Sequence, residues 1–165
     1  MSSTSTLRRD WPPASSWLSL ITRVLGASFL LFFGAAIVTI LLGIDHRIAG
    51  NPVGLLVLRL VRWGSVQGGA EHYELMISVI YVVWGGFLWK AANDPFEHTL
   101  FLDFTVAANA AHFGLMLVQG VVMPGEHIHL AGDVALGWFL LALFAATWIP
   151  ARRKAARLRA ARAGR

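Results

Sequence analysis

The chain has 165 residues, of which 56% are hydrophobic and 14% charged, and it contains seven tryptophans and no cysteine. This length predicts one domain, and this composition is typical of a membrane protein. The absence of cysteine excludes disulfides, thiolate metal sites, iron–sulfur ligation and cysteine nucleophiles. The formal charge of +5 does not indicate a nucleic-acid partner, because seven of the fourteen lysines and arginines follow Pro150.

Four apolar segments are long enough to cross a hydrocarbon layer, which takes about 20 helical residues. They cover about residues 17–44, 73–92, 96–123 and 128–150. The links at AANDP and PGE are short, so the last three spans should be antiparallel neighbours, and Pro150 should end the fourth. The sequence therefore predicts an all-α fold, an integral membrane four-helix up-down bundle over residues 17–150.

The segment between the first two spans, Val53 to Trp63 (VGLLVLRLVRW), has an apolar run that is too short to cross a membrane. It predicts an amphipathic helix that lies in the membrane interface, with Arg59 and Arg62 snorkelling from one side.

Lysine and arginine predict the orientation of the bundle. With both termini in the cytoplasm, eleven of these residues lie inside and three, Arg47, Arg59 and Arg62, lie outside. The positive-inside rule favours this arrangement. Residues 1–16 are then a flexible cytoplasmic N-terminus, and residues 151–165 are a basic tail on the anionic inner leaflet.

Two groups of residues should serve packing and anchoring. Small residues that allow close helix approach are Gly26, Gly34, Gly85, Gly86, Ala107, Ala110, Ala111 and Gly114. Tryptophans that should be mostly interface anchors or lipid contacts are Trp63, Trp84, Trp89, Trp138 and Trp148.

The polar side chains of the spans converge on the outer half of the predicted bundle. At about 1.5 Å per residue, His112 lies about 4 Å from the span centre, Asp133 about 9 Å, Glu74 about 12 Å, and Gln119 and His129 about 15 Å. Because ionisable groups are costly in lipid, these side chains should face one another around an outward-opening pocket. In the inner half, Asp103 could pair with Arg23 or Lys90.

The spacing within single helices supports this convergence. Glu126, His129 and Asp133 are spaced i, i+3, i+7, which places them on one helical stripe. The third span has a similar stripe at Thr105, Asn109, His112, Met116, Gln119 and Met123. The predicted ligand-binding residues are Glu74, His112, Gln119 and Asp133.

A transition-metal site is one interpretation of this pocket. Glu126 and His129 have the Glu-x-x-His spacing that di-metal helix bundles use, and Glu74, His112 and Asp133 could complete the ligand set. Only one copy of the motif is present, so a structural hydrogen-bonded lock, with His129 on Asp133 and Glu74 on His112, is favoured over the metal site, which stays open. Haem is disfavoured, because no second histidine lies at the depth of His112.

The block HYELMISVIYVVWGGFLWKAANDPFEHTLFLDFTVAANAAHFGLMLVQ, followed by HLAGD, resembles a family of small bacterial four-helix membrane proteins of unknown function, loosely similar to the BphX-like and DoxX-like groups. The resemblance covers about His72 to Pro150. Its marks are Tyr73-Glu74-Leu75-Met76, Pro95 with His98, His112 with Met116, and His129 with Gly132-Asp133. It implies a four-span fold with a shared polar set, and it implies no particular activity.

The function expected from these observations is that of a small polytopic protein of the bacterial inner membrane with an outward-facing His/carboxylate pocket. Such a chain would be a non-catalytic accessory or binding component of a larger membrane complex. The alternatives are a metal-dependent membrane oxidoreductase or metal carrier, and a structural or self-associating helix bundle. No nucleophile elbow, phosphate loop or dinucleotide fingerprint is present, which disfavours an enzyme. The expected partners are the lipid bilayer and a larger complex or a second copy, and no nucleic acid.

Overall fold

The computed structural model describes residues 13–63 and 70–164, so residues 1–12 of the predicted flexible N-terminus lie outside the described residues. The regular secondary structure of the described part is entirely helical. Its elements are α2 (Ser16–Leu41), α3 (Ile44–Ala49), α4 (Pro52–Val61), α5 (Glu71–Ala91), the 3₁₀ turn η2 (Pro95–His98), α6 (Thr99–Val122), the 3₁₀ turn η3 (His127–Ala131) and α7 (Asp133–Ala163). The four long helices, α2, α5, α6 and α7, are long and apolar enough to cross a membrane, and they overlap the four segments that the sequence predicts.

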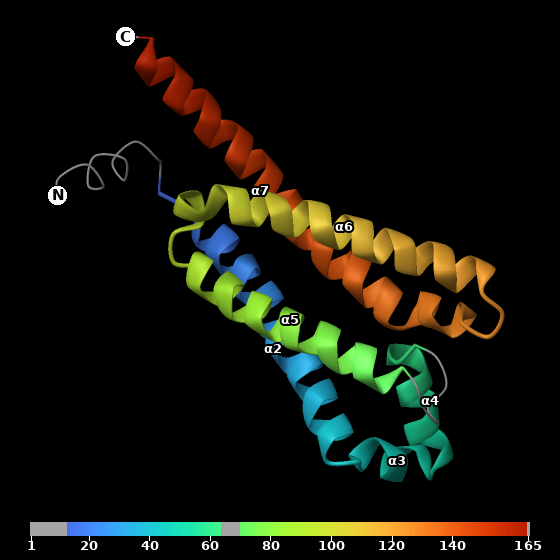
Figure 1. Cartoon of the computed structure of the whole chain (residues 1–165). Coiled ribbons are helices and arrows are strands. Elements are labelled where there is room, and N and C mark those ends of the chain that lie inside the picture. The colour runs from blue at the N-terminus through green and yellow to red at the C-terminus, as the bar shows by residue number, and fades with distance from the viewer. Residues whose placement is uncertain (1–12, 64–69, 165) are drawn as a thin grey trace.

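The four long helices alternate in direction along the chain (Figure 1). The closest pair is α2 with α5, because Gly26 and Gly85 face each other across it. A Cβ atom at either glycine would lie within 2.9 Å of the carbonyl oxygen of the other. The prediction of close helix approach is thus confirmed at these two positions. It is wrong for Gly34, Gly86 and Gly114, where an added Cβ would meet no atom within 4 Å.

Helices α5 and α6 are joined by large side chains. The hydroxyl of Tyr81 donates to Asn109 Oδ1 at 3.2 Å, and Trp84 Nε1 donates to Thr105 Oγ1 at 3.0 Å. The Trp84 ring also stacks on Phe104, with ring centroids 5.1 Å apart. Part of the stripe predicted on the third span therefore faces α5, and aromatic spacers hold these two helices apart.

The apolar core lies at the end of the bundle where α2 begins. Trp148 of α7 is 1% exposed there, and its Nε1 donates to Asp103 Oδ1 at 2.8 Å. Two predictions are therefore wrong: Trp148 is a core residue and not a lipid anchor, and Asp103 pairs with Trp148 and Arg152 instead of Arg23 or Lys90. Arg23 donates to Asn93 Oδ1 at 2.9 Å.

The sequence predicts that the last helix ends at Pro150. This prediction is wrong, because α7 continues to Ala163. Proline removes one backbone hydrogen bond from the helix, which bends or ends many helices. The residues that follow are mostly alanine, arginine and leucine, which have high helix propensity and keep the backbone helical. The basic tail is therefore the last part of α7, and it projects beyond the bundle (Figure 1).

The link between α2 and α5 contains the predicted short apolar helix, α4. Asn51 caps its start by accepting a hydrogen bond from the Gly54 amide at 2.7 Å. Its last helical residue is Val61, and Arg62 has an extended backbone. This change of backbone direction takes Arg62 off the helical stripe on which the sequence placed it with Arg59.

Candidate functional site

A cavity of about 470 Å³ lies among the four long helices, towards the end where α5 and α7 begin and α6 ends. Most of its wall is apolar, and the main contributors are Phe29, Phe32, Phe33, Ala36, Ile77, Phe113, Met116, Leu136 and Leu140. One part of the lining is polar and includes Arg62, Trp63, Glu74, Gln119, Glu126 and Asp133. All four predicted ligand-binding residues, Glu74, His112, Gln119 and Asp133, line this cavity.

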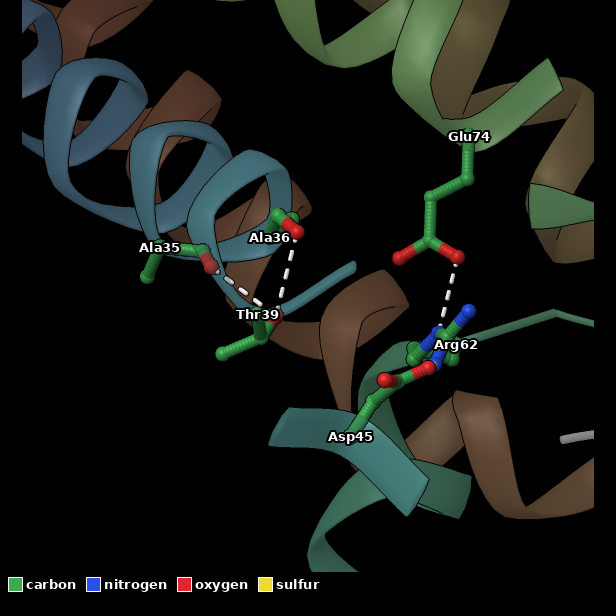
Figure 2. A network of polar contacts seen from close by, with 6 residues as sticks. All are labelled: Ala35, Ala36, Thr39, Asp45, Arg62 and Glu74. Carbon is green, nitrogen blue, oxygen red and sulfur yellow. Dashed lines mark hydrogen bonds and ion pairs between the residues drawn. The ribbon is translucent and has the colours of Figure 1, made fainter. Parts of the chain in front are cut away.

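Arg62 is the central cation of the polar part. Its Nη1 donates to Asp45 Oδ2 and its Nε donates to Glu74 Oε2, both at 2.8 Å (Figure 2). Arg62 is only 8% exposed, so the prediction that it snorkels to the interface is wrong. A buried arginine is tolerated here because carboxylates from α3 and α5 compensate its charge.

The ion pair of Arg62 with Asp45 lies outside the long helices that are apolar enough to cross a membrane, because Asp45 is on α3 and Arg62 follows α4. Its surroundings favour the charged forms. Burial alone would lower the pKa of Arg62, but hydrogen bonds to Asp45 and Glu74 raise it above its usual value. Burial would likewise raise the pKa of Asp45, but the hydrogen bond from Arg62 and the nearby backbone amide of His46 lower it. The two groups therefore hold each other ionised.

A second cluster surrounds His129, which is 1% exposed. Its Nδ1 lies 2.9 Å from Asp133 Oδ1, which is the contact that the sequence predicts, and its Nε2 lies 3.1 Å from Glu126 Oε2. Trp63 covers the imidazole with ring centroids 4.2 Å apart, and its Nε1 donates to Asp133 Oδ2 at 2.7 Å. Glu126, His129 and Asp133 therefore form one contact set, closed by Trp63. The predicted single helical stripe is wrong, because Glu126 and His129 belong to the turn η3 and its cap, and α7 begins only at Asp133.

Gly132 explains how Trp63 reaches this cluster. It lies between η3 and α7, and its α-carbon is packed directly against the end of α4. A Cβ at Gly132 would collide with the carbonyl oxygen of Leu60. The missing side chain thus lets the end of α4 lie against η3, which places Arg62 and Trp63 beside the carboxylates of the other helices.

The five residues of the predicted metal set have different partners in the structure. Glu126, His129 and Asp133 contact one another, and a metal on His129 would have to replace one of its two carboxylate contacts. Glu74 pairs with Arg62 instead of His112. His112 lies in the cavity wall against the rings of Tyr81 and Phe113, at centroid distances of 5.6 and 5.4 Å.

Sequence reasoning missed Arg62, Trp63 and Ser78 as members of this site. Ser78 is fully buried in the cavity wall, and its Oγ has no hydrogen-bond partner among the described residues. The distribution of charged residues along the sequence could have indicated the role of Arg62. The predicted outer half of the chain contains many carboxylates and few cations, so one of its three arginines had to compensate buried acids.

The chain belongs to a family of unknown function (DUF6632), whose model matches residues 48–162. This agrees with the resemblance to a family of unknown function, but the comparisons show no likeness to the BphX-like or DoxX-like groups. The match includes α4 and most of the basic part of α7, whereas α2 and Asp45 precede it. No curated protein and no solved structure matches the chain.

Proposed function

We propose that this chain is a non-catalytic binding protein of the bacterial inner membrane, which holds a small amphiphilic molecule in its cavity as an accessory component of a larger membrane complex. The observation that carries the proposal is the cavity of about 470 Å³ with apolar walls and one polar part. Small-molecule sites typically enclose roughly 300–1,000 Å³, with mostly apolar linings and a few polar groups that orient the ligand.

The charges of the lining favour a particular class of ligand. Three carboxylates, Glu74, Glu126 and Asp133, line the cavity together with one cation, Arg62. The second oxygen of Glu74 is turned away from Arg62 (Figure 2). This excess of hydrogen-bond acceptors suits a ligand with an apolar body and a head group that is cationic or donates hydrogen bonds.

The contacts of the polar part support binding in preference to chemistry. Arg62 is held by two carboxylates, and His129 has a carboxylate at each ring nitrogen. Both oxygens of Asp133 accept hydrogen bonds, one from Trp63 and one from the Val134 amide. Side chains fixed in this way can orient a ligand, and the second oxygen of Glu74 remains available to accept a hydrogen bond from it.

The proposed orientation places both termini in the cytoplasm, so the cavity lies in the outer half of the membrane. The basic part of α7 supports it, because lysine and arginine favour the cytoplasmic side. Labelling of single cysteines tests it directly in a chain that has none. In intact cells a membrane-impermeant maleimide should label Arg47→Cys and should label Ala160→Cys only after permeabilisation. The reverse pattern would refute the orientation.

The cavity itself can be tested by filling it. Ala36 and Ala35 are neighbours on α2, but Ala36 lines the cavity and Ala35 is exposed on the outer surface of the helix. An indole at Ala36→Trp would occupy the cavity, whereas Ala35→Trp would add the same side chain outside it (Figure 2).

The measurement is organic extraction and mass spectrometry of the purified chain. A small amphiphile should accompany the wild-type chain and Ala35→Trp in near-equal amounts, and should be lost from Ala36→Trp. Circular dichroism checks that all three chains are equally helical. A wild-type chain that carries no small molecule, or an Ala36→Trp variant that carries as much as the control, would contradict the proposal.

The accessory role is tested by chemical crosslinking in native membranes. Adducts with a different membrane protein support it, whereas adducts between identical chains alone favour the alternative of a self-associating structural bundle.

A further inference from the structure

Three potential metal ligands converge outside the cavity, where α3 meets the start of α5. Asp45 and His46 belong to α3, and Glu71 is the first residue of α5. One ligand atom from each of these side chains lies within 4.8 Å of the other two. We propose that Asp45, His46 and Glu71 bind a divalent transition-metal ion.

The hydrogen bonding of the two carboxylates supports this inference independently of their proximity. Asp45 is 1% exposed, and its Oδ2 accepts from Arg62, but its Oδ1 is buried without a hydrogen-bond partner among the described residues. Glu71 Oε1 is also buried without a hydrogen-bond partner among the described residues. A buried anionic oxygen without a donor is strongly unfavourable. A cation held by these two carboxylates is one way to satisfy both oxygens.

The donor set selects the class of ion. Two carboxylates balance the charge of a divalent cation, and an imidazole nitrogen favours zinc and its neighbours over magnesium or calcium, which prefer oxygen ligands alone. His46 is exposed and Glu71 is half-buried, so the site is open to ions from solution. Three protein ligands leave room for water in the coordination sphere.

The spacing of the three ligand atoms needs little adjustment. Nitrogen and oxygen ligands lie about 2.0–2.2 Å from zinc, so two ligands of one ion are at most about 4.4 Å apart. The limit of 4.8 Å in the structure is close to this value. A small rotation of the exposed His46 side chain can supply the difference.

Zinc binding by the full chain in detergent tests the proposal. The chain is stripped with a chelator, dialysed against Zn²⁺, and measured by elemental analysis and by calorimetric titration. The wild-type chain should hold one zinc ion. His46→Ala and Glu71→Gln should each weaken zinc binding at least tenfold, and neither change removes the ion pair of Arg62 with Asp45.

Two control variants sharpen the result. His72→Ala removes an exposed histidine next to Glu71 and should bind zinc as the wild type does. Glu126→Gln alters the metal set predicted from the sequence and should also leave zinc binding unchanged. Absence of stoichiometric zinc, wild-type affinity in His46→Ala, or loss of zinc in Glu126→Gln alone would overturn the proposal. Because His46 is exposed, its variant tests the site even if Glu71→Gln fails to fold.

Discussion

Replacement of the buried Arg62 by methionine should strongly destabilise the fold. The variant keeps an unbranched apolar chain but removes two charge-assisted hydrogen bonds, to Asp45 and to Glu74. Hydrogen bonds to charged groups contribute about 1.5–3 kcal/mol each, so the two together contribute about 3–6 kcal/mol. Removal of one partner from a buried ion pair costs about 3–5 kcal/mol by comparison. We therefore expect the free energy of unfolding to fall by about 3–5 kcal/mol.

The assay is equilibrium unfolding in mixed detergent micelles, followed by circular dichroism. Arg59→Met is the matched control, because Arg59 is exposed on α4, three residues before Arg62, and its replacement should change the free energy by no more than about 0.5 kcal/mol. The double variant Arg62→Met with Asp45→Asn should be more stable than Arg62→Met alone, because it no longer buries an uncompensated aspartate. A loss below about 1 kcal/mol in Arg62→Met, or equal losses at both arginines, would refute the reasoning.

Three further changes test the packing and the charges. Trp63→Phe removes the hydrogen bond to Asp133 and should lower the free energy of unfolding by about 1.5–3 kcal/mol in the same titration; an unchanged value would count against this contact. Gly85→Ala should lose about 1–3 kcal/mol because its Cβ would lie 2.8 Å from a carbonyl oxygen of α2, whereas Gly86→Ala, with open space, should lose nothing. The pKa of Asp45 is lowered in the fold, because its hydrogen bonds outweigh burial, so its contribution is present at neutral pH and lost as pH falls below the ordinary value of 3.8. An Asp45→Asn variant should lack that part of the acid unfolding curve, and an identical curve would refute this assignment.

The four long apolar helices were predictable because each is a long apolar run between polar links, and length and hydrophobicity are what a helix needs to cross a membrane. The end of the last helix was not predictable from Pro150, since the helix propensity of the residues beyond it outweighs the lost hydrogen bond. The sequence also did not show which face of each helix packs against its neighbours. Gly85 and Gly86 are adjacent in sequence, but only Gly85 faces α2. When all sides of a helix are apolar, its sequence does not show how the helix is rotated about its own axis.

In the candidate site, contacts between residues close in sequence were predictable, and contacts that depend on tertiary packing were not. Glu126, His129 and Asp133 were predictable as a group because their contacts are three and four residues apart. Arg62 was placed wrongly, since helical periodicity was extended one residue beyond the point where α4 ends. Its true partners depend on the approach of α4 to Gly132, and no pattern within α4 encodes that approach.

Asp45 connects the two proposed sites through its two oxygens. Oδ2 accepts from Arg62, which also holds Glu74 in the cavity lining, and Oδ1 belongs to the carboxylate proposed to bind the metal ion. A divalent ion on Asp45 would offset the negative charge that compensates Arg62, so the guanidinium would interact more strongly with Glu74. The polar part of the cavity would then be less negative and would bind a cationic head group less tightly. By thermodynamic linkage the same ligand would weaken metal binding by the same factor. If both proposals hold, this one carboxylate would make the metal ion and the cavity ligand compete without sharing a site.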